Sequence, residues 1–198
     1  MTAQPPIGRD PVGSALFWTA FAVWALHTPG RRFRSQTKGE RRQDRGTRNF
    51  LLMIIGVGVT LAFVAAYSVE GTAFPGPWQI PLGIGLVLMA SGLSLAEWAA
   101  RTLGRFYRTI VAIQEGHRVV TDGPYRFIRH PIYAGGILTL VGIGTSLGNW
   151  VSVALCLAAA LLGYQRRIRV EEHVLEQGLG EPYLEYERHT KRLVPGIW

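Results

Sequence analysis

One short segment, Gly123–Tyr133, gathers side chains that can bind a charged ligand. It contains two guanidinium groups and several aromatic or imidazole rings, and its last residues include Arg129, His130 and Tyr133. An apolar stretch begins directly after this group. Because cations and polar rings are costly to keep beside a membrane segment unless they hold a partner, the segment predicts a polar pocket at a membrane surface.

A second polar set follows the next apolar stretch and contains Arg167, Glu171 and Glu172. Arginine and glutamate four residues apart on a helix are also typical of a solvated ion pair. If the two apolar stretches form a hairpin, however, the ends that carry the two polar sets meet. Opposed polar sets above an apolar slot predict a ligand between them.

Five apolar blocks contain most of the hydrophobic residues, namely Val12–Leu26, Phe50–Val69, Ile80–Trp98, Ile132–Leu147 and Val151–Tyr164. The second and third have about 20 residues each, enough for a helix to cross a hydrocarbon core of ~30 Å. A single block of this kind also occurs in soluble proteins, but five with almost no internal charge predict an all-α integral membrane protein. We expect five transmembrane helices, the last two forming a short helical hairpin.

The basic residues indicate how these spans are oriented. Of the 21 lysines and arginines, 20 lie in the segments on one side of the five spans, and only Arg9 is left for the other. The positive-inside rule then places the N-terminus outside the cell inner membrane, and the C-terminus and the predicted pocket on the cytoplasmic side. The net charge of +8 does not require nucleic acid, because anionic lipid headgroups account for cations that flank apolar spans. The basic loop 31–48 is expected to be solvated.

Local signals divide the chain near residue 100 into a three-span region, 1–100, and a region that carries the chemistry, 101–198. In the second region, Asp122-Gly123-Pro124 predicts a turn, and Pro131 suits the first turn of a helix. The last apolar block is expected to continue as a polar helix to Gln177, followed by an amphipathic segment, Pro182–Arg192. Residues 105–121 are predicted to form either a small hairpin or an irregular loop.

Three further features of the sequence have structural interpretations. Glycines at positions 56, 58, 83, 85 and 92 are expected to let neighbouring membrane helices approach closely. Glu97 and Arg101 are expected to form a surface ion pair. The single cysteine, Cys156, excludes an internal disulfide and a cysteine-cluster metal site, and no metal is expected.

The polar segments resemble those of the isoprenylcysteine carboxyl methyltransferase family, as a prokaryotic member. The resemblance covers about residues 97–198 and is carried by His117-Arg118-Val119-Val120-Thr121-Asp122-Gly123-Pro124-Tyr125, Arg129-His130-Pro131-x-Tyr133-x-Gly135, Glu171-Glu172 and Gly180-Glu181-x-Tyr183-Leu184-Glu185-Tyr186. It implies a membrane carboxyl methyltransferase that uses S-adenosylmethionine without a Rossmann domain. The sequence has no Gly-x-Gly-x-x-Gly fingerprint that would argue otherwise.

The resemblance also implies a cytoplasmic cofactor pocket, formed by the loop before the hairpin and the helix after it. Its cofactor-binding residues would be His117, Val119, Val120, Gly123, Tyr125, Arg129, His130, Tyr133, Glu171 and Glu172. In this assignment the loop lines the adenosine, and Arg129, His130 and Tyr133 hold the methionine carboxylate. Glu171 and Glu172 take the ribose hydroxyls or the α-ammonium. Arg167 steers an anionic acceptor, so Arg167 and Glu171 are the catalytic candidates.

The expected methyl acceptor is a lipophilic small molecule or a lipidated substrate. Membrane lipids are the other expected partners. It would carry a carboxylate, as in an isoprenylcysteine-like or isoprenoid acid, or a thiol. Such acceptors need no strong base, because proximity and exclusion of water can supply most of the rate. An NADPH-dependent membrane reductase of the sterol-reductase type is one alternative, which the bound cofactor would distinguish. A non-enzymatic membrane scaffold is the other.

Overall fold

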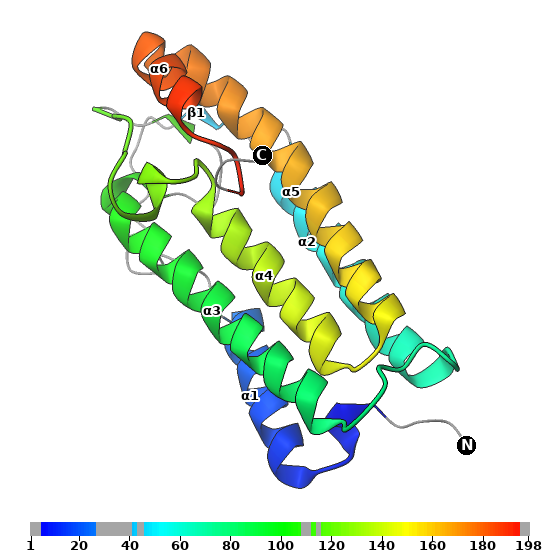
Figure 1. Ribbon diagram of the computed structural model, residues 1–198. Coiled ribbons are helices and arrows are strands. Elements are labelled where there is room, and N and C mark those ends of the chain that lie inside the picture. Colours follow the sequence, from blue (N-terminus) through cyan, green and yellow to red (C-terminus); the bar gives the residue numbers. More distant parts are fainter. Residues whose placement is uncertain (1–4, 27–40, 43–45, 108–111, 114–115, 195–198) are drawn as a thin grey trace.

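The protein is described by a computed structural model that covers residues 5–26, 41–42, 46–107, 112–113 and 116–194 (Figure 1). Its helices are α1 (Pro11–Leu26), α2 (Thr47–Ser68), α3 (Gln79–Leu103), α4 (Pro131–Ser146), α5 (Trp150–Leu179) and α6 (Glu181–His189). Short 3-10 helices occupy Pro6–Gly8, Gly104–Phe106 and Gly123–Arg126. Each predicted apolar block has therefore become a helix, and the all-α expectation is confirmed.

Three of these helices are long and apolar enough to cross a membrane. They are α2, α3 with the 3-10 turn that follows it, and α5. By contrast, α1 and α4 have 16 residues each, so they are short for a full crossing. The protein is an integral membrane protein on this pattern, and the count of five spans stays a prediction.

The helices lie side by side with α4 in the middle (Figure 1). One side of α4 packs against α3, the other packs against α5, and α2 runs along α5. The turn between α4 and α5 is three residues long, and Asn149 caps α5 by accepting a hydrogen bond from the Ser152 amide at 3.1 Å. The predicted hairpin is thus confirmed. The predicted division near residue 100 falls inside α3.

Glycines bring α3 and α4 into backbone contact. A Cβ atom on Gly85 would lie 2.6 Å from the carbonyl oxygen of Gly142, and one on Gly92 would lie 2.5 Å from that of Gly135. Gly58 is packed as closely against Ala159 of α5. The packing prediction is confirmed for these glycines, since small residues permit close helix approach. For residues 56 and 83 it is wrong, because a Cβ there would meet no atom within 4 Å.

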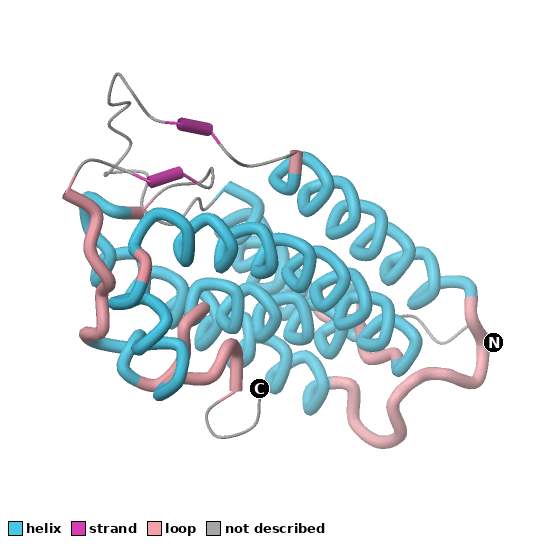
Figure 2. The backbone as a smooth tube through the Cα atoms, turned by 90° about the horizontal axis from the view of Figure 1, so that it is seen from above, coloured by secondary structure: helices cyan, strands magenta, loops and turns pink. Residues whose placement is uncertain are grey.

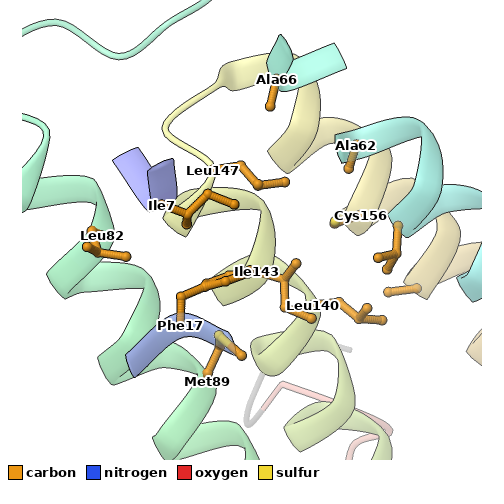
Figure 3. Packing of buried hydrophobic residues seen from close by; sticks show 12 residues of the cluster. Ile7, Phe17, Ala62, Ala66, Leu82, Met89, Leu140, Ile143, Leu147 and Cys156 are labelled. Carbon is orange, nitrogen blue, oxygen red and sulfur yellow. The ribbon is translucent and has the colours of Figure 1, made fainter. Parts of the chain in front are cut away.

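Away from the polar segments, a buried apolar cluster holds the helices together (Figure 3). Phe17 of α1, Met89 of α3, Ile143 of α4 and Cys156 of α5 are fully buried members of it. Large apolar side chains such as Val87 are exposed on the outer faces, where lipid would surround them. This cluster leaves the opposite end of α4 free to form a cavity.

The polar connections show one departure from the sequence predictions. The short strand β2 (Ala112–Ile113) pairs with β1 (Arg41–Arg42) of the basic loop, antiparallel, with Arg41 opposite Ile113 (Figure 2). The segment 105–121 is therefore not a hairpin paired with itself among its described residues. The β-branched run 109–111 and most of the basic loop lie outside the described residues. The ion pair between Glu97 and Arg101 is confirmed, at 2.7 Å on the surface.

The remaining boundary signals are confirmed. Gly123 has φ of +55°, a conformation that favours glycine, and begins the predicted turn. Pro131 occupies the first position of α4, where its missing amide hydrogen costs nothing. The polar extension of α5 ends at Leu179, two residues beyond the predicted Gln177, and Gly180 at φ of +62° separates it from α6.

Candidate active site

A cavity of about 320 Å³ lies where α4 begins, between the polar extension of α5 and the loop that follows α3. Six of the seven tyrosines of the chain line it, namely Tyr107, Tyr125, Tyr133, Tyr164, Tyr183 and Tyr186. Apolar side chains of α2 and α3, among them Leu51, Leu52 and Leu93, line its other part. Aromatic walls with polar edges suit flat rings and cations, and the apolar part suits a hydrocarbon chain.

The two polar sets predicted to face each other do meet at this cavity. Tyr133 at the start of α4 donates a hydrogen bond to Glu171 Oε2 at 2.7 Å, and its hydroxyl oxygen accepts one from Arg167 Nε at 2.8 Å. One tyrosine hydroxyl therefore connects the two candidate catalytic side chains of α5. The rings of His130, Tyr133 and Tyr164 stack in succession, with centroids 5.5 and 5.1 Å apart.

The loop before α4 supplies most of its predicted residues to the cavity. His117, Val119, Val120 and Tyr125 all line it. The His117 ring stacks on Phe106 at 4.9 Å, which holds the loop against the end of α3. Gly123 is not among the lining residues; it turns the chain where a Cβ would meet Thr102 at 2.8 Å, so its position favours a role in the turn.

Glu172 lies behind the cavity wall and is not among the lining residues. Its side chain is 3% exposed and accepts hydrogen bonds from Arg129 Nε at 3.1 Å, His130 Nε2 at 3.2 Å and Arg192 Nε at 2.9 Å. The position favours support of other residues over direct contact with a ligand. Glu171, one residue earlier, lines the cavity.

Arg129 lines the cavity, but most of its guanidinium is used within the protein. Besides Glu172, it donates to the backbone oxygens of Glu187 and Thr190 and to Glu187 Oε1 at 3.0 Å. Those bonds take four of its five N–H groups. Among the described residues, one N–H of Arg129 is therefore left for the predicted contact with a methionine carboxylate. The main role of Arg129 in this structure is to join α4, α5 and α6.

Sequence reasoning missed the contribution of the C-terminal residues and of four of the six lining tyrosines, Tyr107, Tyr164, Tyr183 and Tyr186. Tyr186 donates a hydrogen bond to the Tyr125 backbone oxygen at 2.7 Å, which fastens α6 to the loop. Burial raises the pKa of both Tyr107 and Tyr186 to about 12, so their hydroxyls stay protonated at neutral pH. The Gly-x-x-Tyr-x-x-Tyr spacing was the available signal for α6, because it places both tyrosines on one helix face.

Comparison with known proteins identifies the relatives of this chain. A model of the isoprenylcysteine carboxyl methyltransferase (ICMT) family matches residues 83–177. Protein-S-isoprenylcysteine O-methyltransferase B of Arabidopsis thaliana is 34% identical over 142 residues, which cover 69% of this chain and 72% of that protein. The cobalt-zinc-cadmium resistance protein CzcN of Cupriavidus metallidurans is 32% identical over 141 residues, 70% of this chain and 62% of that protein.

A solved structure has the same fold. The structure of the eukaryotic intramembrane Ras methyltransferase ICMT matches 98% of this chain and 69% of its own, with a TM-score of 0.57 and 21% sequence identity. The Arabidopsis relative favours a methyltransferase over a membrane reductase or a scaffold. The chain belongs to the isoprenylcysteine carboxyl methyltransferase family, and it is an integral membrane methyltransferase.

Proposed function

We propose that this protein transfers a methyl group from S-adenosylmethionine to the carboxylate of a lipophilic acceptor. The observation that carries the proposal is the single cavity described above, which joins a polar, tyrosine-rich end to an apolar part between α2 and α3. A cofactor with a flat ring, an ammonium and a sulfonium fits the first part. When bound, S-adenosylmethionine supplies an electrophilic methyl group on a positively charged sulfur.

The side chains at the polar end fit this cofactor. Glu171 offers a carboxylate, and His130 offers a ring nitrogen 3.7 Å from it, a pair of groups suited to the α-ammonium. Val119, Val120 and Tyr125 would line the adenosine, with His117 at its edge. The aromatic side chains would surround the sulfonium, since rings attract cations.

Arg167 would orient the acceptor. Its side chain is buried at the cavity, and Tyr133 holds it by a hydrogen bond at 2.8 Å. Arginine is suited to a carboxylate because it can donate two parallel hydrogen bonds. A carboxylate is already nucleophilic, so the residues have to align it and exclude water; alignment of this kind can contribute ~7–11 kcal/mol. Leu51, Leu52 and Leu93 would take the hydrocarbon chain.

We further propose that the cavity opens on the cytoplasmic side of the cell inner membrane, with the N-terminus outside. The distribution of basic residues supports this orientation, with 20 of 21 on the cavity side. The plant relatives are named for S-isoprenylcysteine, and an isoprenylcysteine-like acid therefore heads the acceptors to be tested.

The decisive experiment is a binding measurement on the purified protein in detergent. S-adenosylhomocysteine should bind with an affinity in the micromolar range by calorimetry and raise the melting temperature. NADPH should do neither. Stabilisation by NADPH alone would overturn the proposal and support a reductase.

The role of Arg167 is tested separately with a small S-isoprenylcysteine as acceptor. Arg167→Ala should lower methylation at least tenfold and leave S-adenosylhomocysteine binding within a factor of three. Arg166→Ala is the matched control, because Arg166 is exposed and lies over the Phe50 ring at 4.4 Å. If the Arg167 variant loses the cofactor product and keeps its acceptor affinity, the roles are reversed.

A further inference from the structure

Behind the cavity wall, four charged side chains form a cluster with balanced charge, in which Arg129 and Glu172 are buried and Glu187 and Arg192 are partly exposed. Arg129 bonds to Glu172 at 3.1 Å and to Glu187 at 3.0 Å, and Arg192 bonds to Glu172 at 2.7 Å. Two guanidinium groups and two carboxylates thus compensate one another. Glu172 is the most buried member, and a buried carboxylate stays ionised only with such partners.

The charge of Glu172 determines the state of the His130 ring. An ionised carboxylate can only accept hydrogen bonds, so His130 Nε2, which lies 3.2 Å from Glu172 Oε1, must carry a hydrogen and donate it. This leaves the other ring nitrogen, Nδ1, on the side of Glu171 Oε2, 3.7 Å away at the cavity. Which nitrogen of a histidine carries the proton is set in this way by the partner of the other.

Arg192 reaches this cluster from the segment that follows α6, residues 190–193, which we call the C-terminal strap. The strap is bonded to the same loop that carries the histidine: the Arg129 amide donates to the Lys191 oxygen at 2.7 Å, and the His130 amide donates to the Arg192 oxygen at 3.0 Å. The strap therefore fixes both the backbone of His130 and, through Glu172, its side chain.

We propose that Glu172 and Arg192 are positioning residues for His130, and that the C-terminal strap is a structural part of the cofactor site. The inference rests on the proposed binding of S-adenosylmethionine in this cavity. Neither residue lines the cavity, so each acts through the histidine. With Nε2 protonated toward Glu172, the ring turns Nδ1 to the cavity as a hydrogen-bond acceptor for the ammonium of the cofactor.

The substitution Glu172→Leu gives the sharpest test. It removes the oxygen, Oε1, that accepts from both Arg129 Nε and His130 Nε2, and so leaves His130 Nε2 without its acceptor. The histidine proton then favours Nδ1, where Glu171 Oε2 at 3.7 Å can accept it, and there it blocks the ammonium position. In protein with ¹⁵N-labelled histidine, the His130 ring nitrogens should show the opposite tautomer, and the dissociation constant of S-adenosylhomocysteine should rise at least tenfold.

Arg192→Gln should also raise that constant at least tenfold and shift the His130 ring signals, and Arg192→Lys should restore part of both. Arg188→Gln is the matched control, because Arg188 pairs with Glu185 and Glu181 on the exposed face of α6. It should leave the ring signals and the affinity within a factor of two. A folded Arg192→Gln variant with an unchanged His130 spectrum and wild-type affinity would overturn the inference. If that variant does not fold, the His130 tautomer of Glu172→Leu decides.

Failure of the proposed function gives a different result. In that case the wild-type protein would not bind S-adenosylhomocysteine at all. The His130 tautomer would still report on Glu172, because that measurement needs no ligand. A folded Glu172→Leu variant with the wild-type tautomer would refute the positioning role by itself.

Discussion

Removal of one hydroxyl group, by Tyr133→Phe, should disturb both halves of the proposed reaction. The hydroxyl stands between Arg167 Nε at 2.8 Å and Glu171 Oε2 at 2.7 Å. Each of these bonds involves a charged group, a class that contributes about 1.5–3 kcal/mol. Arg167 and Glu171 attract each other and can recover part of the loss by closing the gap. We therefore expect a net cost of about 2 kcal/mol, roughly a thirtyfold effect.

The cost should appear in two measurements. Methylation of an S-isoprenylcysteine, expressed as kcat/KM, should fall roughly thirtyfold, because Arg167 loses a hydrogen bond that helps to orient it. S-adenosylhomocysteine binding, measured by calorimetry, should weaken by up to about tenfold, because Glu171 is no longer fixed. We specifically expect the loss of methylation and the loss of binding to occur together in this one variant.

Tyr164→Phe is the matched control for this prediction. The Tyr164 ring stacks on Tyr133 at 5.1 Å, and its hydroxyl lies against Gly136 and forms no hydrogen bond with the described part of the chain. The control should keep both measurements within about threefold. The reasoning would be refuted if the two variants had equal kcat/KM and equal affinity for S-adenosylhomocysteine. It would also be refuted if Tyr133→Phe lowered only one of these two quantities.

Three other predictions concern the helices. Gly85→Ala places a Cβ 2.5–2.6 Å from backbone atoms of α4 and should destabilise the protein by about 1–3 kcal/mol. Gly83→Ala is the control, because its Cβ lies in open space, and it should be neutral or stabilising. Equal melting temperatures of the two variants in detergent would contradict this prediction. In a cysteine-free background in intact cells, an impermeant thiol reagent should label a cysteine at Thr72 and not one at Arg101, and the reverse pattern would invert the orientation. Asn149→Ala removes the N-cap of α5 and a 2.7 Å hydrogen bond to Thr72. The melting temperature should fall by an amount equivalent to about 1 kcal/mol. An unchanged melting temperature would show that the cap contributes nothing.

Much of the fold was predictable because apolar runs form helices, and glycines and prolines start or end them, through local interactions. The position of Pro131 at the start of α4 and the stop at Gly180 needed no tertiary information. The pairing of Arg41 with Ile113 could not be predicted, since it joins segments 72 residues apart in the chain. Such contacts depend on how the intervening helices pack.

The meeting of the two polar sets was predictable because it depends on the hairpin, whereas the different places of Glu171 and Glu172 were not. Successive residues on an α-helix point about 100° apart, and only Glu171 lines the cavity. The sequence alone does not tell which of the two turns inward. The pairing of Glu172 with Arg192 could not be predicted either, because it depends on how α6 packs against the loop and brings the strap beside α4.

The length of α4 has a consequence for the lipid around the protein. Its 16 residues span about 24 Å, less than a hydrocarbon core of ~30 Å, and its far end is held at the turn before Asn149. If α4 is one of the five predicted spans and its far end lies at the outer surface, Tyr133 would lie several ångströms below the headgroups, level with the upper acyl chains. An acceptor can meet the cavity without lifting its carboxylate far out of the lipid. The bilayer should thin locally to match, and turnover should be fastest in vesicles made of short-chain lipids.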